Sequence, residues 1–92
     1  MTQDRAEAIA LKALEFLVSD EDLLPTFMGS SGVSAQDLRD GAGEPAFLGS
    51  VLDFLLMDDQ WVVRFCDLHK LDYAEVYPAR LSLPGGEQVN WT

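Results

Sequence analysis

The chain is poor in cysteine, in cations and in long apolar runs, and each shortage argues against a class of protein. A single cysteine, Cys66, cannot form an intrachain disulfide, which sets the chain apart from small disulfide-dense secreted domains. Six basic residues against 16 acidic ones leave a net charge of −10, which repels nucleic acid and anionic lipid. No apolar run approaches the roughly 20 residues of a membrane-spanning helix. We therefore expect a cytoplasmic protein that binds neither nucleic acid nor membrane.

A basic region followed by an apolar run is also lacking at the amino terminus, which carries Asp4 and Glu7, so no signal peptide is expected. The 92 residues are 48% hydrophobic, enough for one globular core and too few for two. We place a single domain at residues 1–86. Residues 87–92 form a tail without a readable pattern.

Apolar residues alternating with period two are missing, so strands are not expected. Over residues 4–19 the apolar positions recur every three or four residues and leave only a narrow polar stripe. They form two neighbouring rows: Ile9, Ala13, Phe16 and Leu17 in one, Leu11, Leu14 and Val18 in the other. The pattern predicts a largely buried central helix.

Capping residues and prolines mark the starts of six helices in all. These starts are Asp4 (with Glu7 as a capping box), Asp20, Ser34 (with Asp37), Pro45, Asp58 and Asp72. Pro25 is expected to kink or delay the second helix, and Pro78 to interrupt or kink the last one.

The second half of the chain repeats the first with a shift of 38 positions. The matching residues are Leu14, Phe16, Leu17, Asp20 and Phe27, which fall on Leu52, Phe54, Leu55, Asp58 and Phe65. Such a repeat indicates a supersecondary unit that cannot bury its apolar face alone. The predicted fold is all-α: a small six-helix bundle of two pseudo-twofold-related three-helix repeats, about 4–41 and 44–83. The first and fourth helices are expected to pack against each other.

Several segments also resemble a family of short proteobacterial proteins catalogued only as a domain of unknown function. They are Ala8-Ile9-Ala10-Leu11 with Leu14-Glu15-Phe16-Leu17, Asp37-Leu38-Arg39, and Glu44-Pro45-Ala46-Phe47-Leu48 followed by Val51-Leu52-Asp53-Phe54-Leu55-Leu56. The resemblance covers nearly the whole chain up to Gly86, and the last stretch is its most specific part. It implies this fold and a bacterial cytosol, but no activity. The chain departs from the family pattern at Pro25, Trp61, His69 and Pro78.

The acidic residues would suit metal ligands or acid/base pairs, but their positions indicate helix caps. Eleven of the 16 stand at predicted helix starts, where carboxylates accept free backbone N–H groups and meet the positive end of the helix dipole. The remaining acids are Glu15, Asp40, Asp53, Asp67 and Glu87. No cofactor, metal site or catalytic residue is predicted from them.

Cys66 and His69 lie three apart on one predicted helix and share a face, so they form the one pair with metal-ligand chemistry. A structural zinc site needs four ligands, and the chain has no second cysteine or histidine. The simpler interpretation is a buried thiol beside a surface histidine near a helix end. A small metal- or ligand-binding protein using this pair remains an alternative.

The large amphipathic aromatic residues gather in the second half of the chain. Trp61, Tyr73, Tyr77 and Trp91 form a candidate partner surface, because such rings are favoured at interfaces. Tyr73 and Tyr77 are four apart and are expected on one helical face. The leading hypothesis is a non-enzymatic helical protein–protein interaction module, or a dimer that self-associates through this surface. An acidic nucleic-acid mimic that occupies a basic protein's groove is the other alternative.

Overall fold

The computed structural model describes residues 1–84, and the regular structure within them is helical. The helices are α1 (Gln3–Ser19), α2 (Leu23–Ser31), α3 (Ala35–Gly41), α4 (Pro45–Leu55), α5 (Asp59–His69) and α6 (Val76–Leu81), with a 3₁₀ turn, η1 (Tyr73–Glu75), before α6. No strand occurs in this part of the chain, so the all-α prediction is confirmed. Trp91 and the predicted tail lie outside the described residues.

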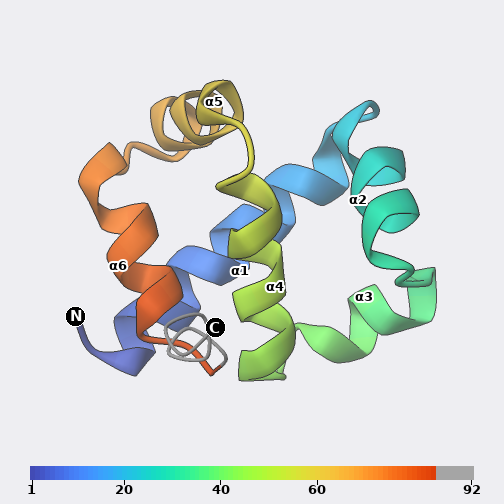
Figure 1. Ribbon diagram of the computed structural model, residues 1–92, viewed down its shortest axis with the longest axis horizontal. Helices are drawn as coiled ribbons and strands as arrows, with labels where there is room; N and C mark the ends of the chain where they lie inside the picture. The colour runs from blue at the N-terminus through green and yellow to red at the C-terminus, as the bar shows by residue number, and fades with distance from the viewer. Residues whose placement is uncertain (85–92) are drawn as a thin grey trace, which may run out of the picture.

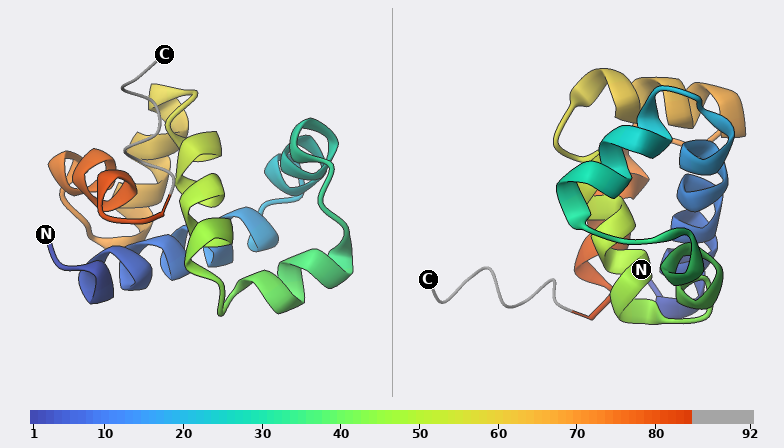
Figure 2. Two further views of the ribbon diagram at one scale, coloured as in Figure 1. Left: turned by 60° about the horizontal axis from the view of Figure 1, so that its bottom comes forward. Right: turned by 90° about the vertical axis from the view of Figure 1, so that its right-hand side faces the viewer.

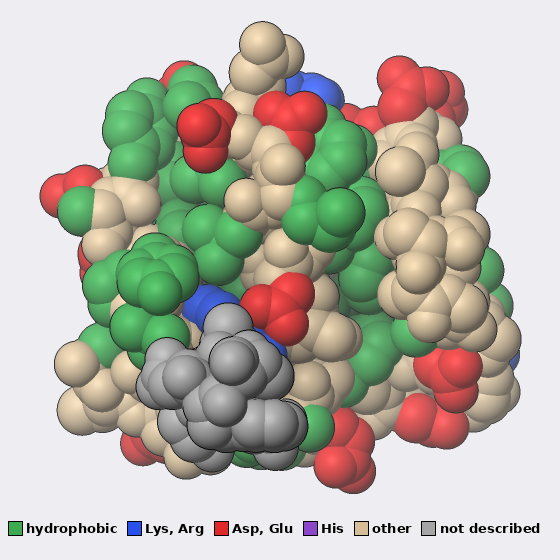
Figure 3. Space-filling model, viewed as in Figure 1, with side chains coloured by type: hydrophobic (Ala, Val, Ile, Leu, Met, Phe, Trp, Pro, Cys, Tyr) green, Lys and Arg blue, Asp and Glu red, His purple; other side chains and the backbone are tan. Residues whose placement is uncertain are grey.

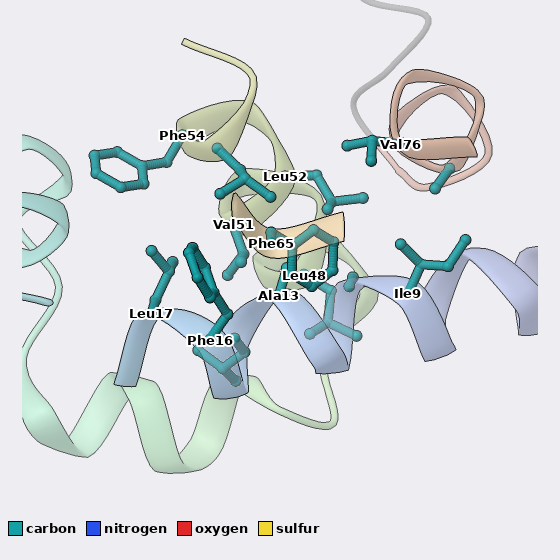
Figure 4. Close-up of a cluster of buried hydrophobic side chains, with 14 of the residues drawn as sticks. Ile9, Ala13, Phe16, Leu17, Leu48, Val51, Leu52, Phe54, Phe65 and Val76 are labelled. Atoms are coloured by element: carbon teal, nitrogen blue, oxygen red, sulfur yellow. The ribbon is translucent and has the colours of Figure 1, made fainter. Parts of the chain in front are cut away.

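Helices α1 and α4 cross at the centre of the molecule and make its most extensive helix–helix contact, as predicted. Helices α5 and α6 lie on one side of this pair, and α2 and α3 lie on the other (Figures 1 and 2). The side chains of α1 and α4 face each other in the core, joined by Phe65 from α5 and Val76 from α6 (Figure 4). No helix within residues 1–84 is both long and apolar enough to cross a membrane.

Most helices begin at the predicted caps. Ser34 and Asp37 form a reciprocal capping box, with the Ser34 N–H donating to Asp37 Oδ2 over 2.9 Å. Asp58 and Asp72 each accept a backbone N–H two residues further on, at 2.8 and 2.9 Å. Asp20 accepts the N–H groups of the next turn, and these bonds hold the pKa of its carboxyl below the usual value. Local hydrogen bonding therefore sets these helix starts.

The first predicted helix start is wrong in detail, and the second is delayed. Thr2, and not Asp4, caps α1, because its hydroxyl accepts the Arg5 N–H at 3.2 Å and starts the helix earlier. Glu7 instead accepts a hydrogen bond from the Gln3 side chain. Helix α2 begins at Leu23, later than the predicted start at Asp20, which agrees with the delayed start expected from Pro25. Pro25 is the third residue of this helix, where its missing N–H has no intrahelical acceptor to lose.

The last predicted helix is interrupted before Pro78, not at it. The segment after Asp72 forms η1, and α6 begins at Val76. A proline ring clashes with the carbonyl four residues earlier in an α-helix, which here belongs to Ala74. The 3₁₀ geometry at Ala74 avoids that clash and places Pro78 in the first turn of α6.

The two halves share details at the 38-residue shift, but they do not pack alike. The helices α2 and α5 both end in a left-handed residue, Gly32 at φ 76° and Lys70 at φ 57°. Helix α6 packs on both α1 and α4, whereas its counterpart α3 contacts α4 sparsely and α1 even less. The duplication itself stays a prediction, and the loose packing of α3 leaves part of α1 uncovered.

Candidate docking surfaces

Three large side chains, spaced four residues apart on η1 and α6, are exposed, and we call them the tyrosine ridge: Tyr73, Tyr77 and Leu81. Their exposed fractions are 52%, 61% and 48%. Hydrophobic side chains gather over the α5 and α6 side of the face shown in Figure 3. The Tyr73 hydroxyl donates to Asp67 Oδ1 over 2.6 Å, and this bond raises the tyrosine pKa. The ridge therefore presents neutral, amphipathic rings to solvent.

Trp61, another predicted member of the partner surface, is not part of the ridge. Trp61 is partly buried in the first turn of α5 and stacks on Phe54 of α4, with ring centroids 4.8 Å apart. Tyr73 instead bonds to Asp67, in the last part of α5. Trp61 thus packs α5 on α4. Trp91 lies outside the described residues.

A shallow apolar groove of about 420 Å³ opens beside α1 and is lined by Leu11, Leu14, Glu15, Val18, Ser19 and Ala42. We call it the α1 groove. The expectation of a largely buried α1 is wrong here, because Leu11 and Val18 are 43% and 50% exposed. Helix α3 packs little on α1 and does not cover this row, and Leu38 is its only large apolar side chain. That polar composition was a signal the sequence offered.

Ion pairs hold three of the four arginines. Arg5 pairs with Glu75 at 3.0 Å, and Arg64 pairs with Asp20 at 2.6 Å while lying over the Phe16 ring. Arg80 pairs with Asp53, and it is the only buried charged residue among residues 1–84. These pairs use three carboxylates of the 16 in the chain, so the surface stays strongly acidic.

The Arg80 guanidinium sits in a cradle between α4 and α6. Its Nε donates to Asp53 Oδ1 at 2.5 Å, its Nη2 to Asp53 Oδ2 at 2.9 Å, and its Nη1 to the Pro84 carbonyl at 3.1 Å. Gly49 makes room for it, because a Cβ there would lie 2.6 Å from Nη1. The bidentate contact and the carbonyl bond fasten the end of α6 to α4.

The Cys66–His69 pair shows no metal-site geometry. The Cys66 thiol is buried in the core, and its pKa is raised by that burial and then by the nearby carboxylates of Asp67, Asp72 and Glu75. The partly exposed His69 ring lies 5.1 Å from the Phe65 ring. Within residues 1–84, no three His, Cys, Asp or Glu side chains are grouped so as to hold a metal ion.

The structure therefore defines a small acidic all-helical domain whose notable surface features are an aromatic ridge and an apolar groove. The chain belongs to the family described as protein of unknown function (DUF3572), whose model matches residues 3–86. This membership confirms the resemblance to a domain of unknown function. Comparison with curated proteins and with solved structures gave no match.

Proposed function

We propose that the protein is a non-enzymatic helical module that binds a protein partner through the tyrosine ridge. The observation that carries the proposal is the row of Tyr73, Tyr77 and Leu81, each about half exposed on one edge of the domain. Tyrosine is enriched among the residues that dominate binding energy at interfaces. The one thiol, by contrast, is buried with a raised pKa, which is the opposite of an activated nucleophile.

The charge of the chain favours a different protein over a second copy as the partner. Two copies each carrying −10 repel one another as they approach, and two acids lie at the ridge: Asp67 bonds to the Tyr73 hydroxyl, and Asp72 directly precedes Tyr73. A partner with a basic rim around an apolar pocket meets both features of this surface. The experiment must distinguish binding of such a partner from self-association.

The test places a photo-crosslinking amino acid at position 77 of the full chain, in cells that encode the protein, to identify the partner. Affinity is then measured by titration calorimetry with the purified pair. Tyr77→Ser is expected to weaken Kd roughly 30-fold, about 2 kcal/mol, as for an interface hot spot. Met57→Ser is the matched control, because Met57 is 74% exposed and lies outside the ridge.

Three results would contradict this proposal or change its form. Equal loss of affinity in the Met57 control would deny the ridge any specific role. A crosslink to a second copy, with a dimer in sedimentation that Tyr77→Ser dissociates, would make the ridge a self-association surface. Binding that disappears at high salt while Tyr77→Ser has no effect would indicate acidic mimicry, because exposed charges are screened and apolar contacts are not.

A further inference from the structure

The α1 groove has a counterpart in the second half of the chain, and there the corresponding space is filled. Shifting the groove residues by 38 positions gives Gly49, Leu52, Asp53, Leu56, Met57 and Arg80. Arg80 thus stands where the first half has Ala42, and Asp53 stands where it has Glu15. The chain therefore presents the same helix face twice, once with an arginine on it and once without.

In the filled copy, the arginine makes the contact between helices. The Arg80 side chain lies across α4, is only 8% exposed, and binds both oxygens of Asp53. Helix α6, which carries it, packs closely on α4. Asp53, an acid flanked by apolar residues on α4, is therefore covered by α6, which carries the arginine.

In the open copy, the acid and its apolar neighbours are present without the arginine, and Leu11 stands where the second half has Gly49. Ala42 ends at its methyl group, and α3 packs little on α1. Within residues 1–84, the exposed Glu15 carboxylate takes part in no ion pair. Leu11 and Val18 lie one turn to either side of it along α1 and are about half exposed. The groove is apolar apart from one uncompensated acid.

We propose that the α1 groove binds a helix of another protein that bears an arginine, with the guanidinium paired to Glu15. The aliphatic part of the arginine lies between Leu11 and Val18, since long basic side chains cover apolar surface while keeping their charge near solvent. Leu11 replaces Gly49, so the guanidinium lies further from the helix backbone than Arg80 does. The net charge of −10 favours a basic helix over a second copy of this chain.

This inference does not depend on the tyrosine ridge, and its test uses different positions. A photo-crosslinking residue replaces Val18 in the full chain, in cells that encode the protein, and the crosslinked peptide is identified by mass spectrometry. The same residue at position 57 sets the background, because Met57 is also highly exposed. We expect a crosslink from position 18 to a peptide of another protein that contains arginine among apolar residues.

Two further substitutions test the chemistry of the groove itself. Ala42→Arg supplies the missing side chain from within the chain, as Arg80 does in the second half, and is expected to reduce the crosslink about tenfold by occupying the groove. Glu15→Arg, at an exposed position that leaves the core untouched, is expected to do the same by repulsion. Circular dichroism and thermal melting check that both variants fold. If Ala42→Arg does not fold, Glu15→Arg alone tests the proposal.

The proposal is overturned by any of four results. The first is a crosslink to a second copy of the chain, and the second is a peptide without a basic residue. The third is a crosslink that does not exceed the background from position 57, and the fourth is one that persists in the folded Glu15→Arg variant.

Discussion

At the residue scale, Arg80 shows how one charged side chain is accommodated in a small core. It is buried because Asp53 and the Pro84 carbonyl satisfy its donors and because Gly49 leaves room beside it. A buried charge is tolerated only with such partners. Asp53 remains about half exposed, so solvent moderates the strength of the pair. This contact fixes α6 in place against α4.

Gly49→Ala is therefore expected to destabilise the fold, although alanine is the better helix former. The added methyl group must displace the guanidinium from its bonds, which costs about 1–2 kcal/mol net of the helix-propensity gain. Gly29→Ala is the matched control: α2 has open space there, so the same change is expected to stabilise by roughly 1 kcal/mol. Urea denaturation measures both. Stabilisation by both substitutions would mean that the Arg80 contact contributes little.

At the element scale, α2 and α5 end in the same backbone conformation but have different residues there. Both helices end in the left-handed region, which glycine adopts at no steric cost and lysine adopts with strain. Lys70→Gly is therefore expected to stabilise the protein by up to about 1 kcal/mol. Gly32→Ala is expected to destabilise it by about the same amount. Melting temperatures of the two variants check this, and shifts of the same sign would contradict it.

The same scale shows which parts of the fold and of the surfaces were predictable from sequence. The caps at Ser34, Asp58 and Asp72 were, because each bonds only to backbone within a few residues. The exposed tyrosines were also anticipated, although the 3₁₀ geometry of η1 was not. The α1 groove was missed because burial of Leu11 depends on where α3 packs, which no local pattern records. The short length and polar composition of α3 did indicate that it would cover α1 poorly.

At the scale of the whole molecule, the uncompensated acidity opposes compactness. Only three carboxylates within residues 1–84 take part in ion pairs, while the chain carries a net charge of −10. Self-repulsion of this kind lowers the free energy of unfolding and is screened by salt. The acids that cap helices are nevertheless favourable where they stand, so the repulsion is a global effect.

Raising the NaCl concentration from about 0.01 M to about 0.5 M is therefore expected to raise the melting temperature. A gain of about 1 kcal/mol would correspond to roughly 4–8 °C for a domain of this size. Differential scanning calorimetry measures the shift. Glu21→Gln, at an exposed acid outside the three ion pairs, is expected to reduce the salt effect slightly. A melting temperature that falls with salt would show that the ion pairs outweigh the repulsion.

The central position of α1 also determines when the core can form during synthesis. This helix is made before the other five, yet the helices that bury it, chiefly α4 and α6, end at Leu55 and Leu81. At about 5–20 residues per second, roughly 3–12 s separate the synthesis of Ser19 from that of Leu81. The contact of α1 with α4 becomes possible once Leu55 is made, but its contact with α6 has to wait until the end of that interval. The core of this protein therefore closes only when its last helix has been made.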